Sequence, residues 1–146
     1  MLIKDSQLAS GAIALLMVSS ALLALALLGQ AFTAGMAAIV DPEWWQTHLA
    51  WVHVFQWLVV IIPASAAASS ARRHVKWASL GPLVLMGLEY VLAHRGMEGS
   101  FPIGLGLHAV GAFILFGMAL CLLFEAHKGL RKSYRQWPRW QRAEEP

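Results

Sequence analysis

The sequence predicts an all-α integral membrane protein, a four-helix bundle with both termini in the cytoplasm. Of its 146 residues, 58% are hydrophobic and only 13% are charged. A soluble domain carries charged residues at about twice that level. Four long apolar segments follow one another, and about 20 such residues suffice to cross a bilayer. We therefore expect one bundle at residues 1–127 and a basic cytoplasmic tail at residues 128–146.

The first span is expected at about residues 11–32. No charged residue occurs between Ser6 and Val40, so the apolar run has length to spare and tilt can extend the span to Ile39. Lys4 before an apolar core resembles the start of a secretory signal. The apolar core is too long for one, so we expect the segment to remain as a transmembrane helix.

The second span is expected at about residues 46–70. Pro63 lies inside it and should kink the helix, because proline removes one backbone hydrogen bond and its ring meets the preceding turn. The segment that follows, residues 64–70, is rich in alanine and serine. Small residues of this kind allow another helix to approach closely.

The third and fourth spans are expected at about residues 77–94 and 103–124. A short basic loop around residues 72–76 precedes the third span, and a turn rich in glycine, serine and proline at residues 95–102 separates the two. In the tail, Trp137 and Trp140 are expected to anchor the chain at the membrane interface.

The distribution of lysine and arginine predicts the orientation. Ten of these residues flank the termini and the second loop, and only Arg95 lies on the other side. Cytoplasmic loops carry the excess of positive charge, so both termini should face the cytoplasm and the first and third loops the outside. The expected location is the bacterial inner membrane, with the lipid bilayer as the first partner.

Composition also excludes several classes of site. Cys121 is the only cysteine, so the chain has no intrachain disulfide, no Cys-x-x-Cys pair and no motif for covalent haem attachment. The basic residues flank apolar segments and form no stripe of their own, which indicates lipid head groups and not nucleic acid as their partners.

Two histidines stand inside otherwise apolar spans. His53 and His108 each lie six or seven residues inward from the expected outer ends of the second and fourth spans, roughly 10 Å at 1.5 Å per residue. Ionisable residues in spans are costly and commonly functional. Facing histidines at one depth are what a haem iron with two axial imidazoles requires. We therefore expect a non-covalent haem b bound by His53 and His108.

The residues around these histidines are expected to shape the haem site. Gly111 and Ala112 follow His108 on the same helical face and would leave room for a flat porphyrin. Trp57 could pack along the ring, while Gln56 or Gln30 could orient an imidazole or a propionate. The alternative is that His53 and His108 only hydrogen-bond between helices.

The segments HLAWVHVFQWL and LGLHAVGAF carry a resemblance to known proteins. With a histidine on helix two and another on helix four, the chain resembles four-helix membrane cytochromes b and one half of haem A synthase. It also resembles small uncharacterised bacterial four-span proteins with an LHAVGA-like segment. The synthase has two such halves and a glutamate before its helix-two histidine, where this chain has Leu49 and Ala50. The resemblance therefore implies electron transfer or haem sensing, with His53 and His108 as ligands.

A secondary site is expected near the outer face. Glu89 and His94 in the third span could form a proton path or a quinone pocket, or Glu89 could simply hydrogen-bond to a neighbouring helix. His48, His94 and Met97 could bind copper or zinc, because imidazole and thioether groups suit copper.

The favoured hypothesis is a membrane-embedded b-type haem protein that passes electrons between a quinol or another redox partner and an acceptor. This describes an electron-transfer component rather than a stand-alone enzyme, and the sequence indicates no catalytic residues. One alternative is a cofactor-free accessory or assembly subunit of a larger membrane complex. The other alternative is an outer-face copper or zinc site.

Overall fold

The computed structural model describes residues 2–136 and the side chains of residues 8–132. This part of the chain is helical apart from its turns and contains no strand. Trp137 and Trp140, the expected interfacial anchors, lie outside the described residues. The helices are α1 (Leu2–Ile39), α2 (Trp44–Phe55), α3 (Leu58–Ala68), α4 (Arg73–Ala78), α5 (Gly81–Met97) and α6 (Ile103–Gln136).

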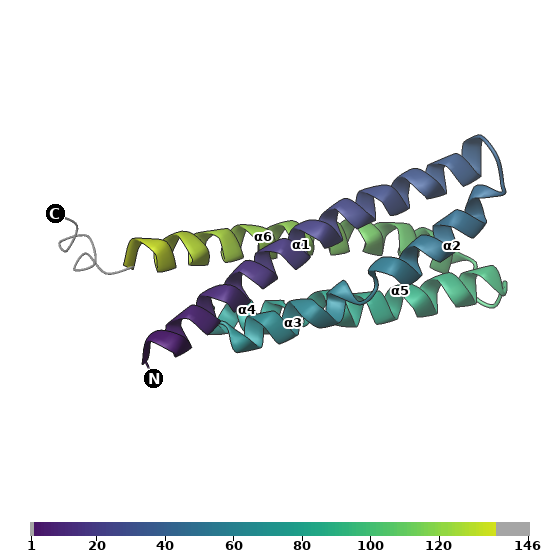
Figure 1. Ribbon diagram of the computed structural model, residues 1–146. Coiled ribbons are helices and arrows are strands. Elements are labelled where there is room, and N and C mark those ends of the chain that lie inside the picture. The colour runs from purple at the N-terminus through teal and green to yellow at the C-terminus, as the bar shows by residue number, and fades with distance from the viewer. Residues whose placement is uncertain (1, 137–146) are drawn as a thin grey trace.

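Four segments are long and apolar enough to cross a membrane. They are Leu8–Ile39, Trp44–Ala68, Arg73–Met97 and Ile103–Lys132. Figure 1 shows that the start of α1 and the end of α6 lie at one end of the bundle, here called the terminal end, and that the α1–α2 and α5–α6 turns lie at the other, the distal end. The predicted all-α bundle of four membrane spans is confirmed, and its orientation in the membrane stays a prediction.

The second span breaks at Gln56 and Trp57, about two turns before Pro63. Backbone hydrogen bonds from Val59 to Gln56 and from Val60 to Trp57 have the tighter i→i+3 pattern there. Pro63 itself lies inside α3. The break in the helix therefore precedes the proline. Proline lacks the backbone N–H that would bond to the preceding turn, and the break lies on that side of it.

The third span also has two parts, because the expected basic loop is partly helical. Arg72 is extended and caps α4, which ends at a turn at Ser79 and Leu80. The next helix, α5, begins with Pro82 in its first turn. Proline is well accommodated there because its fixed φ suits the helix and no backbone donor is lost.

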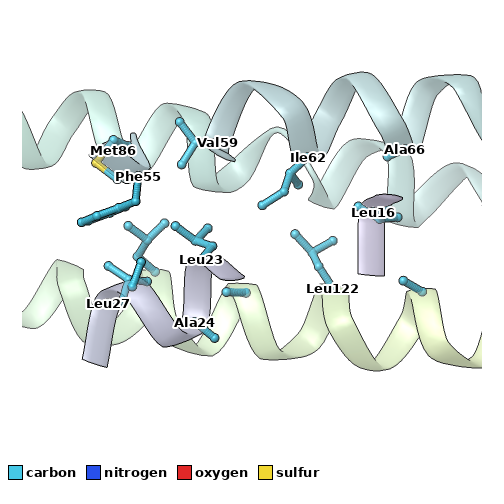
Figure 2. Packing of buried hydrophobic residues seen from close by; sticks show 14 of the residues in the cluster. Leu16, Leu23, Ala24, Leu27, Phe55, Val59, Ile62, Ala66, Met86 and Leu122 are labelled. Atoms are coloured by element: carbon cyan, nitrogen blue, oxygen red, sulfur yellow. The ribbon is translucent and has the colours of Figure 1, made fainter. Parts of the chain in front are cut away.

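The core runs along the bundle where the four spans meet (Figure 2). Leu23 and Leu27 of α1 face Phe55 and Met86, and further along the bundle Ile62 and Leu122 meet Leu16. These side chains are buried, whereas most large apolar residues elsewhere on the helices are exposed. An apolar outer surface suits contact with lipid. Lipid tails are as apolar as these side chains, so there is little driving force to bury them inside the bundle.

Two hairpins make up the distal half of the bundle. Here α2 packs on α1 and α5 packs on α6, while α2 has few contacts with α5 or α6. The Trp51 ring lies over Gly29 and donates a hydrogen bond of 2.9 Å to the carbonyl oxygen of Ala26. Trp51 thus binds α2 to α1. Figure 1 shows the two hairpins extending together toward the distal end.

Glycine allows α5 and α6 to approach closely. A Cβ at Gly104 would lie 2.7 Å from the carbonyl oxygen of Leu92, and a Cβ at Gly96 would lie 2.7 Å from Cγ of Leu105. Atoms at such distances clash, and backbone cannot move aside as a flexible side chain can. Close approach at these glycines therefore fixes the spacing of the second hairpin.

We expect Gly104→Ala to lower the free energy of unfolding by about 1–3 kcal/mol, because the new methyl group overpacks the contact with Leu92. Gly106→Ala is the matched control, since a Cβ at Gly106 meets nothing within 4 Å. It should leave stability unchanged or slightly raised, as alanine favours helix. Denaturant unfolding in mixed micelles measures both, and equal stability of the two variants would contradict the close approach.

The orientation can be tested by cysteine labelling in a Cys121→Ala background. Ser100 in the distal turn and Ser70 between α3 and α4 are exposed and lie at opposite ends of the bundle. A membrane-impermeant maleimide should label Ser100→Cys in intact cells and Ser70→Cys only after permeabilisation, as the distribution of positive charge predicts. The reverse labelling pattern would place the termini outside.

Candidate functional site

Glu89 is the buried acidic residue of the membrane spans. It lies on the face of α5 that packs on α6, with only 3% of its surface exposed. Gly111 of α6 lies directly against its carboxylate, and a Cβ on Gly111 would overlap the carboxylate oxygen Oε1. Gly111 thus provides the space that Glu89 fills, so this space is not the expected clearance for a porphyrin.

The carboxylate of Glu89 faces His108. Oε2 of Glu89 lies 2.6 Å from Nδ1 of His108, and the two side chains are 4% and 31% exposed. The contact between Oε2 and Nδ1 does not have the geometry of a regular hydrogen bond. Both carboxylate oxygens and Nδ1 are buried and have no regular hydrogen bond to any described residue. A buried charge without a partner is strongly unfavourable, so this pairing holds α5 and α6 in register.

The other ring nitrogen of His108 is free. Nε2 forms no hydrogen bond or ion pair with any described residue. A histidine that binds a metal commonly directs its second ring nitrogen to a carboxylate, which fixes the tautomer and the ring orientation. Glu89 lies at Nδ1 of His108, as the carboxylate does at such a metal-binding histidine. Nε2 is therefore the nitrogen available to bind a ligand.

His48 has a different role, because α1 occupies both of its ring nitrogens. The Gln30 side-chain amide nitrogen lies 2.9 Å from Nε2 and also donates to the backbone oxygen of His48 at 3.2 Å. Nε2 then accepts, so Nδ1 carries the proton and faces the Gln30 carbonyl oxygen at 3.2 Å and Thr33 Oγ1 at 3.3 Å. His48 is buried and links α2 to α1. Gln30, predicted to orient a haem imidazole or propionate, serves this link.

His53 is exposed on α2, close to the helix break. Its Nδ1 lies 3.5 Å from the side-chain nitrogen of Gln56, and the hydroxyl of Tyr90 donates to Gln56 Oε1 at 2.8 Å. Tyr90 follows Glu89 on α5. Glu89 contacts His108 directly, and Tyr90 is linked to His53 through Gln56. Nε2 of His53, like that of His108, forms no hydrogen bond or ion pair with any described residue.

The helix bounds change the expected depths of the histidines. His53 is the tenth residue of α2 and His108 the sixth of α6, an offset of about one helical turn counted from the helix starts. His48 is the fifth residue of α2 and lies within electrostatic range of His108. The second span begins two residues earlier than expected, which accounts for part of this offset, and a common depth of His53 and His108 in the membrane stays a prediction.

Trp57 and Ala112 are the remaining residues expected at the haem site. Trp57 is 64% exposed at the break between α2 and α3, where it can meet lipid or a bound ring. Ala112 follows Gly111 on α6 and is half-buried. The Ala112 methyl group can contribute only packing to a site in the distal half, whereas Trp57 offers a ring face and one indole N–H donor.

The expected outer-face metal site is not assembled in the described part of the chain. His94 is exposed and lies 3.0 Å from Glu98 on its own helix. His48 points to α1, Met97 is exposed, and no group of three or more histidine, cysteine, aspartate or glutamate side chains could hold a metal ion among the described residues. Glu89 pairs with His108 and not with His94.

Sequence reasoning identified Glu89 and His108 but not their pairing. A carboxylate in one span and a histidine in the next, followed three residues later by Gly111, could have indicated it, because the glycine provides room for the carboxylate. Thr33 and Tyr90 were missed, since a lone hydroxyl in an apolar span has no sequence signature of its partner.

The fold and these contacts define the class of protein: a four-span helical membrane protein with a buried carboxylate–histidine pair. Residues 30–98 match the model of DUF6220, which is described as a family of unknown function. The matched segment contains His48, His53 and Glu89, while His108 lies beyond it. No curated protein and no solved structure matches the chain, so the resemblance to cytochromes b and haem A synthase stays a prediction.

The energetic importance of the buried pair can be measured by a double-mutant cycle with Glu89→Gln, His108→Gln and the double variant. We expect a coupling energy of about 1–3 kcal/mol, because each single variant leaves a buried polar group without its partner. His94 and Glu98 form the matched exposed pair, for which the same cycle should give below about 0.5 kcal/mol. Equal coupling in the two cycles would show that burial adds nothing to the Glu89–His108 contact.

Proposed function

We propose that the protein is a membrane-embedded b-type haem protein for electron transfer, with the haem in the distal half of the bundle between α2 and α6. The observation that supports this proposal most strongly is the free Nε2 of His108, whose Nδ1 lies against the buried carboxylate of Glu89. His108 would hold a haem iron through Nε2, with Glu89 supporting the imidazole at Nδ1.

His53 is the proposed ligand on the opposite side. It is a histidine of α2 with a free ring nitrogen, since His48 has both nitrogens bonded to α1. His53 is exposed and His108 is partly exposed. A ligand at these side chains would cover imidazoles that are unfavourable in contact with lipid. The sparse contacts of α2 with α5 and α6 allow the hairpins to separate there.

The protein supplies ligation, orientation and electrostatics. Glu89 keeps the imidazole of His108 in one tautomer, and when ionised it stabilises nearby positive charge in a medium of low dielectric constant. The bonds between His48 and α1 hold the helix that carries His53. A bound haem would supply one-electron chemistry, and the surrounding residues set its potential.

The proposed electron donor is a quinol or a redox partner protein, reached within the lipid bilayer or at its surface. The proposed setting is the bacterial inner membrane, with the distal end outside, as the charge distribution predicts. Gln56 lies at the break in the second span, and Tyr90 of α5 donates a hydrogen bond to it. These two groups would offer an amide and a hydroxyl to a quinone ring.

Absorption spectroscopy tests the proposal. Full-length protein expressed with adequate haem supply should show a low-spin Soret band. His108→Ala should lose the haem, because it removes the ligand that Glu89 orients. His53→Ala should lose the low-spin signal, and His74→Ala at the terminal end should leave the spectrum unchanged.

Protein that folds but has no Soret band would contradict haem binding and favour the cofactor-free accessory subunit. Metal analysis of that haem-free protein would then detect copper or zinc if an outer-face metal site is present. Equal haem retention by His53→Ala, His108→Ala and His74→Ala would refute the ligand assignment while leaving haem binding intact.

A further inference from the structure

The terminal end of the bundle contains a cavity that His48, His53 and His108 do not line. It has a volume of about 330 Å³ and lies between α1, the α3–α4 connection, α4 and α6. Ile13 and Leu16 of α1 and Val75 of α4 form its apolar wall, and all three are buried. The volume lies at the lower end of the range for small-molecule sites, roughly 300–1,000 Å³.

The rim of this cavity is basic. Arg72, Lys128 and Lys132 line it together with one carboxylate, that of Glu125. Lys128 Nζ lies 2.7 Å from Glu125 Oε1, so this carboxylate is already paired. Arg72 lies within electrostatic range of Glu125, and Lys132 has no partner among the described side chains. The rim therefore carries excess positive charge available to an anion.

The position of the rim relates this charge to the membrane surface. Arg72 lies in the connection between two spans, and Lys128 and Lys132 follow the apolar part of α6. The cavity thus runs from the apolar interior of the bundle to the level of lipid head groups. Basic pockets between spans on the cytoplasmic side bind anionic lipid head groups, and the charge distribution assigns this end to the cytoplasm.

We propose that the cavity binds the head group of one anionic phospholipid. The phosphate lies between Arg72 and Lys132, because a guanidinium matches two phosphate oxygens and an ammonium supplies a point charge. The glycerol and the first acyl carbons lie against Ile13 and Leu16. A free phosphate would satisfy only the rim, whereas a phospholipid matches both the basic rim and the apolar wall.

Native mass spectrometry of the delipidated full-length chain tests this proposal, with dioleoyl phosphatidylglycerol as the probe. One lipid should bind per wild-type chain, and Arg72→Gln/Lys132→Gln should bind it roughly 30-fold more weakly. Arg73→Gln/Arg131→Gln is the matched control, because it removes the same charge from exposed neighbours that do not line the cavity. This control should bind like wild type.

A second variant tests the cavity without changing charge. Gly129 lines the cavity, and a Cβ there would lie 3.7 Å from Ile13, which is an ordinary van der Waals contact. Gly129→Leu should fill the space and weaken lipid binding. Unfolding measurements on every variant separate loss of the site from loss of the fold.

Three outcomes would overturn the proposal. Equal phosphatidylglycerol affinity of the two double variants would show that the rim charges do not form the site. Equal binding of dioleoyl phosphatidylcholine by the wild-type chain would show that head-group charge is not recognised. Displacement of phosphatidylglycerol by millimolar inorganic phosphate would identify a free phosphate and not a lipid as the ligand.

Discussion

The contact between Glu89 and His108 joins α5 to α6 in the distal half of the bundle, and the proposed site depends on it. A carboxylate at membrane depth is unfavourable unless a partner compensates it, and His108 is that partner at 2.6 Å. The contact requires α5 and α6 to lie close together, which glycine at position 111 permits. The pair and the small residues around it are therefore parts of one arrangement, in which neither helix can shift without leaving a buried polar group without its partner.

Different interactions hold the two helices of each hairpin together. Hydrogen bonds from His48 and Trp51 attach α2 to α1, while close glycine contacts and the Glu89–His108 pair attach α5 to α6. Where the spans meet, apolar side chains such as Phe55 and Met86 pack together instead. Polar bonds thus hold each hairpin together distally, and the proposed ligand site lies between them.

The sequence predicted the class of fold because bilayer thickness sets span length, and four apolar runs are visible without any structure. It identified Glu89 and His108 because ionisable residues stand out in such runs. It placed Gln30 and Gly111 beside a haem, and only the packing shows that Gln30 bonds to His48 and that Gly111 accommodates Glu89. The rotation of each helix about its axis decides which side chains become partners. In a span whose outer face meets lipid, both faces are apolar, so the sequence has little periodicity from which that rotation could be predicted.

The most direct test of the account is a redox titration of the bound haem over mildly acidic to mildly alkaline pH in wild type and Glu89→Gln. Ionised Glu89 stabilises the oxidised, more positive haem, so the wild-type midpoint potential should fall as pH rises and the carboxylate loses its proton. Glu89→Gln should flatten this dependence with the Soret position nearly unchanged. Parallel curves for the two proteins, or protein that binds no haem, would contradict the claim that Glu89 acts through His108 on a haem.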